Sequence, residues 1–378
     1  MPTKISDLLI IGGGLHGCAS ALFAAHHGLR VTLLEKDSIG RHASGVNAGG
    51  VRRLGRALPE IALSCRAMQM WRQIETIVDD DCGFHSVPQI KVAENDDDLA
   101  FLTERVSQLA ETGFSHEQMI DRQTLRAFLP NVSEHCVGGL HSDDGYAMPY
   151  QTTAAFARKA RALGVSIHEA EKPHHIVCEN TVWRVETNSG SYRAKSLLNC
   201  AGAWGGEIAS QIGDHAPVEA IAPLMIVTQR MKPFCTAVVG TARRPLSFKQ
   251  MANGTVVIGG GRLGHADLDT NRSDISFAEL RHTARTASDI FPVMRKAVVQ
   301  RTWSGIEGRT PDSLPIIGRS LRHENAFHAI GFSAHGFQLG PAIGALMADF
   351  IATGTRPPEL APFTLERFDA ANIQPERK

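Results

Sequence analysis

The stretch that decides the fold is DLLIIGGGLHGCASALFAAHHGLRVTLLEK, residues 7–36. An apolar run enters a glycine-rich turn, a helical stretch follows, and a second apolar run ends at Glu35. Short apolar runs on either side of a helical pattern are typical of two parallel strands joined by a helix. The sequence therefore predicts a right-handed, Rossmann-like βαβ unit near the start of the chain.

The turn inside this unit has the G-x-G-x-x-G spacing of a dinucleotide-binding loop, with Gly12, Gly14 and Gly17 at the strand-to-helix corner. Missing side chains permit the tight turn and let the backbone meet a diphosphate, whose charge the helix N-terminus favours. Glu35 follows Gly14 by 21 residues (35 − 14), where a carboxylate can accept hydrogen bonds from ribose hydroxyls. These features predict dinucleotide binding and leave NAD and FAD both open.

The next segment, RHASGVNAGGVRRLGR at 41–56, favours FAD. An NAD dehydrogenase usually continues with further strands and helices, whereas this segment is rich in Gly, Ser, Asn and Arg and is expected to be a loop. Such a loop can wrap the diphosphate and reach a flavin ring, while its arginines face a substrate. A solvated basic loop is the alternative.

Composition limits the remaining possibilities. The 378 residues suit two domains. Lys plus Arg equals Asp plus Glu at 39 each, without a basic stripe, which argues against a nucleic-acid partner. Seven cysteines without a CxxC pair argue against a disulfide framework, a metal or iron-sulfur site in this chain, and a flavin disulfide reductase. No secretory signal pattern or apolar run of about 18 residues occurs, so a cytoplasmic protein without a transmembrane segment is expected.

Three later motifs complete the pattern: LLNCAGAWG at 197–205, WSGIEGRTPDSLPIIG at 303–318 and GFSAHGFQLGP at 331–341. With IIGGGLHGCASA, Glu35 and HASGVNAGGVR, their order resembles the D-amino acid oxidase-like superfamily of FAD-dependent amine oxidoreductases over nearly the whole chain. The SGVNAGGVR form is most similar to β subunits of opine oxidases and of D-hydroxyproline and L-proline dehydrogenases.

The resemblance implies an α/β plus α+β fold in which two domains interleave. A Rossmann-like FAD-binding domain is expected from 1–85, 145–215 and 305–378. An antiparallel-sheet substrate domain is expected from 86–144 and 216–304.

The resemblance also implies how FAD is held: the first glycine loop meets the diphosphate, and a last helix, expected to start near Pro341, lies under the flavin ring. No metal is expected. The implied cofactor-binding residues are Gly12, Gly14, Leu15, His16, Glu35, Lys36, Ser44, Asn47, Ala48, Gly49, Gly50, Ala201, Gly202, Trp204, Gly305, Gly336, Phe337, Gln338 and Leu339.

The implied activity is oxidation of the CH–NH bond of an amino acid by hydride transfer to flavin N5. Arg52 is the favoured carboxylate clamp and Arg309 a second candidate, while His335 is expected to touch flavin or substrate. Glu307 stands where glycine oxidase-like sequences have an arginine. Two roles stay open for it: it faces the cavity and binds a cationic group, or it pairs with Arg309.

The favoured assignment is the catalytic β subunit of a heteromeric dehydrogenase or oxidase acting on an opine, D-hydroxyproline or proline. Partner subunits would carry an iron-sulfur centre, a second flavin or both, and an acceptor at the inner membrane would make the complex peripheral there. A stand-alone glycine, sarcosine or D-amino acid oxidase producing hydrogen peroxide is the alternative. An electron-transfer subunit without an amine site is a third possibility.

Overall fold

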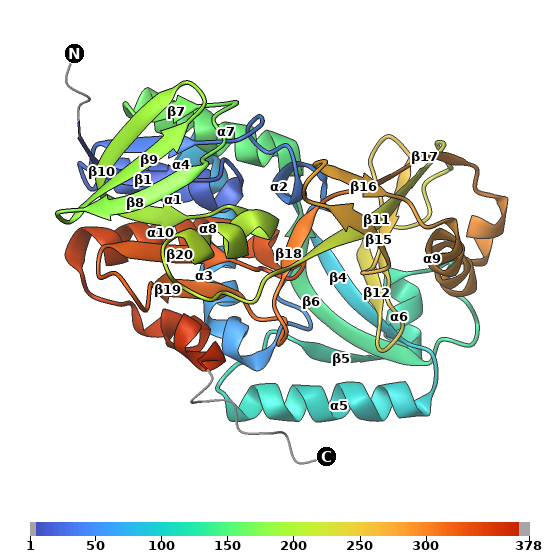
Figure 1. Cartoon of the computed structure of the whole chain (residues 1–378). Coiled ribbons are helices and arrows are strands. Elements are labelled where there is room, and N and C mark those ends of the chain that lie inside the picture. Colours follow the sequence, from blue (N-terminus) through green and yellow to red (C-terminus); the bar gives the residue numbers. More distant parts are fainter. Residues whose placement is uncertain (1–4, 370–378) are drawn as a thin grey trace.

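Two β-sheets form the framework of the protein (Figure 1), whose computed structural model describes residues 5–369. The first sheet has the order β19-β20-β10-β1-β2-β7, and the hairpin β8–β9 continues from β10. Its strands are β1 (Ser6–Ile11), β2 (Val31–Leu34), β7 (Ser166–His168), β8 (His175–Glu179), β9 (Val182–Thr187), β10 (Gly190–Asn199), β19 (Ile316–Arg319) and β20 (Ala326–Ile330).

The second sheet has the order β16-β15-β11-β14-β13-β12-β4-β6-β3, with β17 and β18 also paired to β11 and β5 paired to β6. Its strands are β3 (Gly50–Val51), β4 (His85–Ala93), β5 (Gln118–Asp121), β6 (Gly138–Tyr146), β11 (Glu219–Thr228), β12 (Val238–Thr241), β13 (Ser247–Gln250), β14 (Val256–Gly259), β15 (Leu263–Asp267), β16 (Arg272–Asp274), β17 (Val299–Ser304) and β18 (Glu307–Arg309).

Helices accompany both sheets, and the long α5 runs alongside β5 at the lower edge of Figure 1. The helices are α1 (Leu15–His26), α2 (Ala43–Val46), α3 (Ile61–Trp71), α4 (Ile74–Val78), α5 (Asp96–Glu111), α6 (Arg122–Phe128), α7 (Pro149–Ala162), α8 (Gly205–Gln211), α9 (Phe277–Ile290) and α10 (Gly336–Thr353).

The predicted βαβ unit is confirmed, since β1 pairs in parallel with β2 and also with β10. All of β2 and the last four residues of β1 are buried, because a parallel sheet in an α/β protein is covered on both faces. The chain leaves β1 through Gly12, whose φ is +111°. A Cβ there would stand 2.3 Å from the carbonyl oxygen of Cys200, so this corner requires glycine.

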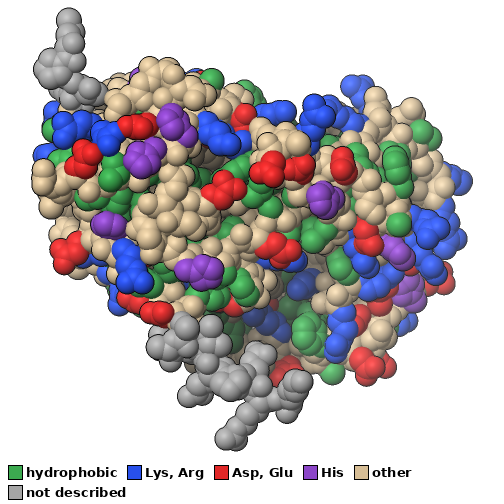
Figure 2. Space-filling model, viewed as in Figure 1, with side chains coloured by type: hydrophobic (Ala, Val, Ile, Leu, Met, Phe, Trp, Pro, Cys, Tyr) green, Lys and Arg blue, Asp and Glu red, His purple; other side chains and the backbone are tan. Residues whose placement is uncertain are grey.

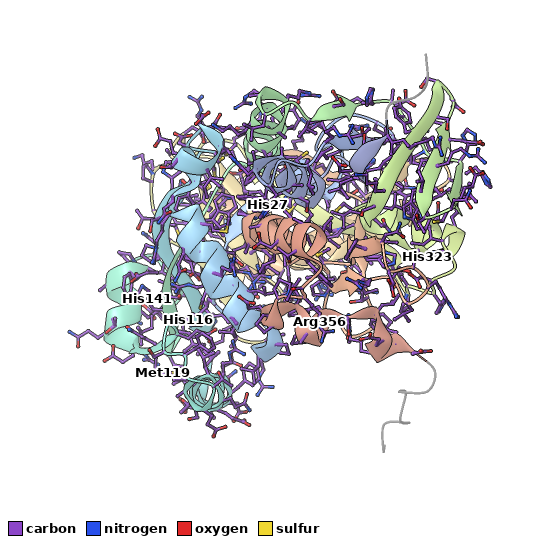
Figure 3. The ribbon with its side chains drawn as sticks, turned by 90° about the vertical axis from the view of Figure 1, so that its left-hand side faces the viewer. His27, His116, Met119, His141, His323 and Arg356 are labelled. Atoms are coloured by element: carbon purple, nitrogen blue, oxygen red, sulfur yellow. The ribbon has the colours of Figure 1, made fainter. Side chains whose placement is uncertain are left out.

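Helices α1 and α10 lie side by side because glycines remove the side chains between them (Figure 3). A Cβ on Gly340 would be 2.5 Å from Cδ2 of Leu15, and one on Gly344 would be 2.4 Å from Cβ of Ala19. Near the other ends of the helices, Nε2 of His27 lies 2.7 Å from Oδ1 of Asp349. The order of these contacts makes the helices parallel, so their N-termini open at the same end of the layer.

The second sheet is antiparallel except where β12 pairs in parallel with β4. These two strands come from distant segments of the chain and therefore need no hairpin between them. Hairpin turns join the antiparallel pairs β9–β10 and β13–β14. The expected fold class is confirmed, while the domain boundaries stay a prediction. Strands β3 and β18 pair within the second sheet although both lie in stretches expected for the FAD-binding domain.

Two local expectations were wrong. The last helix begins at Gly336, and Pro341 lies inside it, although proline favours the first turn of a helix. Packing outweighs this preference, because Gly336, Gln338 and Leu339 are all buried. The segment 41–56 is not a continuous loop, since it contains α2 and β3.

None of the helices within residues 5–369 is long and apolar enough to cross a membrane. Acidic and basic side chains both occur over the face shown in Figure 2, as the formal net charge of zero leads one to expect.

We expect Gly12→Ala to cost more than about 3 kcal/mol of unfolding free energy and to prevent cofactor retention, because the methyl group meets backbone. Gly28→Ala is the matched control. Gly28 also has a positive φ of +77°, but a Cβ there would meet no atom within 4 Å, so only about 1–2 kcal/mol of backbone strain is expected. Urea unfolding and flavin absorbance per chain measure both effects. Equal losses in the two variants would contradict this account of the corner.

Candidate functional site

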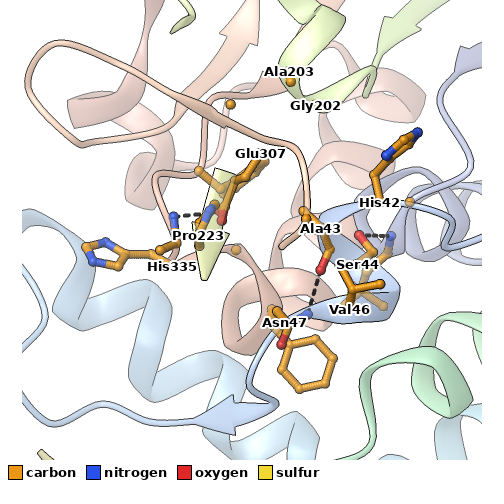
Figure 4. Close-up of a pocket in the computed structure, with 18 of the residues that line it drawn as sticks. His42, Ala43, Ser44, Val46, Asn47, Gly202, Ala203, Pro223, Glu307 and His335 are labelled. Carbon is orange, nitrogen blue, oxygen red and sulfur yellow. Dashed lines mark hydrogen bonds between the residues drawn. The ribbon is translucent and has the colours of Figure 1, made fainter. Parts of the chain in front are cut away.

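A cavity of about 550 Å³ is lined by the loops that follow β1, β2, β10 and β20 and by strands of the second sheet (Figure 4). Most of the predicted cofactor-binding residues line it. They are Gly12, Gly14, Leu15, His16, Glu35, Lys36, Ser44, Asn47, Ala48, Gly50, Ala201, Gly202, Trp204, Gly305, Gly336, Phe337 and Gln338.

The N-terminus of α1 lines the cavity. Its N-cap, Gly14, has no side chain with which to cap the helix. The backbone N–H of Leu15 donates to Oγ of Ser44 at 2.9 Å, and a Cβ on Gly14 would meet the same oxygen at 2.9 Å. The helix start is therefore held close to the loop after β2 without a charged side chain of its own, which suits the diphosphate of a dinucleotide.

Glu35 stands beside this helix start at the end of β2. Its carboxylate accepts hydrogen bonds from the backbone N–H groups of Gly13, at 2.6 Å, and Asp37, at 2.8 Å. Burial raises the pKa of Glu35 above its usual value, although the two N–H groups oppose that effect. The backbone thus fixes a cavity-lining carboxylate where the sequence predicts a ribose partner.

The wall of the cavity at Lys36 and Trp204 carries a cluster of side chains that joins both sheets. Nζ of Lys36 lies 3.8 Å from the ring centroid of Trp204 and donates to Asp37 and to Oδ1 of Asn271, at 2.6 and 2.7 Å. Asn271 belongs to the turn between β15 and β16. This turn therefore reaches across from the second sheet to the loop after β2.

The N-terminus of α10 also lines the cavity; this helix begins at Gly336, and the side chain of its N-cap His335 makes no capping hydrogen bond. A Cβ on Gly336 would lie 2.7 Å from Cε1 of His16. The side chain of Gln338 is held by Ser64, which donates to its oxygen and accepts from its nitrogen. The positive end of this helix dipole stabilises negative charge that develops beside it.

His16 links the two helix starts. Its ring stacks on Phe332 with centroids 3.6 Å apart, and burial lowers its pKa to about 3. The imidazole is therefore neutral at ordinary pH. Two uncapped helix N-termini and an oriented carboxylate line one cavity, so the residues present fit a single FAD. Its diphosphate would lie at Gly14 and the electron-accepting edge of its ring at Gly336.

Three predicted site residues do not line the cavity. Gly49 has a φ of +69°, and a Cβ there would be 2.2 Å from the carbonyl oxygen of Ala147, so it shapes a turn. Leu339 is fully buried in the core. Arg309 pairs with Glu219 at 2.8 Å and lines a separate surface depression, because β18 carries it past the cavity. We leave Arg309 out of the proposed substrate site.

Glu307 faces the cavity, as Figure 4 shows, and its Oε1 accepts a hydrogen bond from the N–H of Ala334 at 2.6 Å. Burial raises the pKa of Glu307 to about 7. Since Arg309 pairs elsewhere, the geometry matches the first of the two expected roles for Glu307, that of a cavity-facing group.

Arg52 also lines the cavity, and its Nη1 donates to the carbonyl oxygen of Leu54 at 2.7 Å. Burial lowers the pKa of its guanidinium. No ion pair within 4.0 Å joins Arg52 to a carboxylate of residues 5–369. A half-buried arginine without a carboxylate partner among the described residues is suited to bind the carboxylate of a ligand.

His335 contacts a carboxylate that the sequence gave no reason to select. Its Nδ1 lies 3.0 Å from Oε2 of Glu60, which is 0% exposed. Burial lowers the pKa of His335, as do the charges of Arg56 and Arg52, although Glu60 opposes them. A neutral imidazole oriented by a carboxylate can accept a proton from a bound ammonium group.

Arg56, Lys91 and Gln89 also line the cavity and were missed from the sequence. Arg56 lies in the quoted loop, but the resemblance favoured Arg52 in that loop and gave no reason to add Arg56. Arg53 instead pairs with buried Asp144 at 2.9 Å. Lys91 and Gln89 alternate along β4, and an alternating strand pattern shows which residues share a face without showing what that face meets.

We expect Glu307→Gln to remove a pH-dependent loss of stability. The folded carboxyl has a pKa of about 7 against an ordinary value of 4.5, so the folded state binds more protons than the unfolded state between these pH values. Stability of the wild type therefore falls, relative to the variant, as pH rises from about 5 to about 7, by on the order of 1–3 kcal/mol.

Urea unfolding of both proteins at pH 5, 6, 7 and 8 measures this difference. A difference in unfolding free energy that stays constant across the series would contradict a raised pKa of Glu307.

Known proteins of similar sequence or fold match nearly the whole chain. The sarcosine oxidase β subunits of Arthrobacter sp. and Rhizobium meliloti are 26% and 28% identical, with coverage of 98% and 100% of this chain and 93% and 91% of theirs. L-proline dehydrogenase from P. horikoshii has the same fold, with a TM-score of 0.90, 24% identity and coverage of 98% and 100% of the two chains.

Glycine oxidase from Geobacillus kaustophilus also shares the fold, with a TM-score of 0.88 at 22% identity and coverage of 97% and 100%. Residues 7–350 match the family described as FAD dependent oxidoreductase (DAO). The match spans most of the chain and includes both helix N-termini of the cavity. The chain therefore belongs to the DAO family of FAD-dependent oxidoreductases.

Proposed function

We propose that this enzyme oxidises the CH–NH bond of an amino acid whose amine is secondary, of the opine, hydroxyproline or proline type. The observation that carries the proposal is Arg52, a half-buried guanidinium that lines the cavity and forms no ion pair with a carboxylate of the described residues. An α-amino acid would supply that carboxylate. The names of the relatives, which include sarcosine oxidase subunits and a proline dehydrogenase, support the same substrate class.

The chain's own residues orient the substrate. Arg52 binds the carboxylate, which fixes the α-carbon relative to the start of α10. Bound FAD supplies the acceptor for the hydride that leaves this carbon. His335, held by Glu60 at 3.0 Å, accepts the proton that the ammonium form must lose first, because only a neutral amine can donate its lone pair as the hydride leaves.

Glu307 serves the amine side of the substrate in this proposal. A carboxyl with a pKa of about 7 becomes ionised when a cationic group binds beside it, since opposite charge lowers a carboxyl pKa. An amine or guanidinium substituent of the substrate would have this effect. Glycine oxidase-like chains have an arginine at this position, so Glu307 favours a substrate that differs from glycine.

We further propose that the chain works as the β subunit of a heteromeric dehydrogenase or oxidase, as the names of its sarcosine oxidase relatives suggest. Partner subunits would then carry an iron-sulfur centre or a second flavin. The second candidate is a stand-alone oxidase of glycine, sarcosine or a D-amino acid that forms hydrogen peroxide. Reoxidation of the reduced protein by air separates the two: fast peroxide formation by the isolated chain favours the oxidase.

The test is anaerobic stopped-flow absorbance of the flavin band with octopine, nopaline, D- and L-proline, hydroxyproline, sarcosine and glycine. Fast bleaching by a secondary amino acid is the expected result. If every amine leaves the flavin oxidised, the chain does not oxidise this class of substrate by itself and the proposal fails.

We expect Arg52→Met to raise the apparent substrate Kd about 100-fold, because a charged hydrogen bond to the carboxylate contributes about 1.5–3 kcal/mol. Arg52→Lys retains the charge without the bidentate geometry, so its substrate Kd should lie between those of Arg52→Met and the wild type. Arg309→Met is the matched control, since it removes an arginine that pairs outside the cavity. Comparable effects of the Arg52 and Arg309 variants on Kd would contradict the assignment of Arg52.

A further inference from the structure

Three cationic side chains line the same cavity from the loop at 52–56 and from β4: Arg52, Arg56 and Lys91. None of them forms an ion pair within 4.0 Å with a carboxylate in the part of the chain that the structure describes. This distinguishes them from neighbouring cations, because Arg53 pairs with Asp144 and Arg105 pairs with Glu117, each at 2.9 Å. Three cations on one side of the cavity therefore lack a direct carboxylate partner among the described residues.

The nearby carboxylates are already committed to other groups. Asp144 accepts from the side chain of Arg53 and from two backbone N–H groups. Glu117 accepts two hydrogen bonds from Arg105 and one from the N–H of Gly55. Glu60 faces His335. Each of these carboxylates therefore contacts a group other than the three cations.

Arg56 is the least satisfied of the three. It is only 2% exposed, its Nε donates to the carbonyl oxygen of Arg52 at 3.1 Å, and its Nη1 has no hydrogen-bond partner among residues 5–369. Burial lowers the pKa of its guanidinium to about 9, and the charge of Arg52 adds to the effect. A buried N–H donor without an acceptor is costly, so an acceptor on a ligand would bind there favourably.

Lys91 approaches the same region from β4. Burial lowers its pKa to about 8, and the charge of Arg52 contributes. Its Nζ lies where a Cβ on Gly55 would be only 2.7 Å away, and Gly55 has a φ of +72°. The loop thus has a glycine where it lies closest to the amino group of Lys91. The absent side chain leaves room for this amino group beside Arg52.

We propose that Arg56 and Lys91 form a second anion subsite, so that the substrate is a secondary amine carrying two carboxylates, an N-(carboxyalkyl) amino acid. The inference rests on the proposed function, in which Arg52 binds the first carboxylate. The second carboxylate satisfies the unpartnered Nη1 of Arg56 and the charge of Lys91. Proline and sarcosine, which have one carboxylate, would leave this subsite unpaired.

The test uses two ligands that the flavin cannot oxidise as amines, thiodiacetate and (methylthio)acetate, which differ in one carboxylate. Each is titrated into the purified, FAD-loaded chain, and the shift of the visible flavin spectrum gives its Kd. We expect thiodiacetate to bind at least about tenfold more tightly, since charged hydrogen bonds contribute on this scale.

Arg56→Met and Lys91→Met should each remove most of this preference and leave the Kd of (methylthio)acetate nearly unchanged. Two variants are needed because Arg56 is so deeply buried that its replacement can disturb folding. Arg243→Met is the matched control. Arg243 lines the cavity but pairs with Asp98 at 3.3 Å, so its loss should not change the preference.

Equal Kd values for the two ligands would overturn the second subsite, as would variants that weaken both ligands equally. This outcome is distinct from failure of the proposed function, which is tested by flavin bleaching with iminodiacetate and sarcosine. Thiodiacetate selectivity without any bleaching would support the subsite and refute the oxidation. Bleaching by both amines at equal substrate concentrations, without thiodiacetate selectivity, would support the oxidation and refute the subsite.

Discussion

The contact between α1 and α10 is the constraint on which the site depends. Gly340 and Gly344 allow α10 to approach Leu15 and Ala19 so closely that a Cβ at either glycine would overlap its neighbour. The two helices are far apart in the sequence and parallel in space. Their N-termini therefore reach one cavity, and the stacked rings of His16 and Phe332 lie between them. The glycine-rich turns at 12–17 and 331–336 therefore line one cavity, which fits a single FAD.

The second sheet completes what these helices begin. It contributes Lys91 from β4 and, through the turn after β15, the Asn271 that contacts Lys36. In the proposed function, the first sheet with its helices would hold the cofactor, while the second sheet and the loop at 52–56 would determine the charge that a substrate meets. In this division, the cations on the substrate side of the cavity are those that have no carboxylate partner among the described residues. These cations lose hydration without gaining a carboxylate partner, and this burial lowers the pKa values of Arg56 and Lys91.

The cofactor half of the site could be predicted from sequence because its chemistry is local. A tight turn needs Gly12, and a carboxylate at the end of β2 needs only the strand to end at Glu35, so spacing alone identifies both. The start of α10 was misplaced because the preference of Pro341 for a first turn is weaker than the burial of Leu339. The substrate side depends on strands that meet only in the folded protein. Neither the separation of Arg309 from the cavity nor the approach of Lys91 to Arg52 leaves a pattern in the sequence.

The most direct test of the central claim is a crystal structure of the purified, FAD-loaded protein. The account predicts one FAD per chain, with its diphosphate at the N–H groups that follow Gly14 and the pyrimidine edge of its ring at the N-terminus of α10. An FAD whose ring lies away from Gly336, or a second nucleotide bound at the α10 turn, would contradict the claim that both helices serve one flavin.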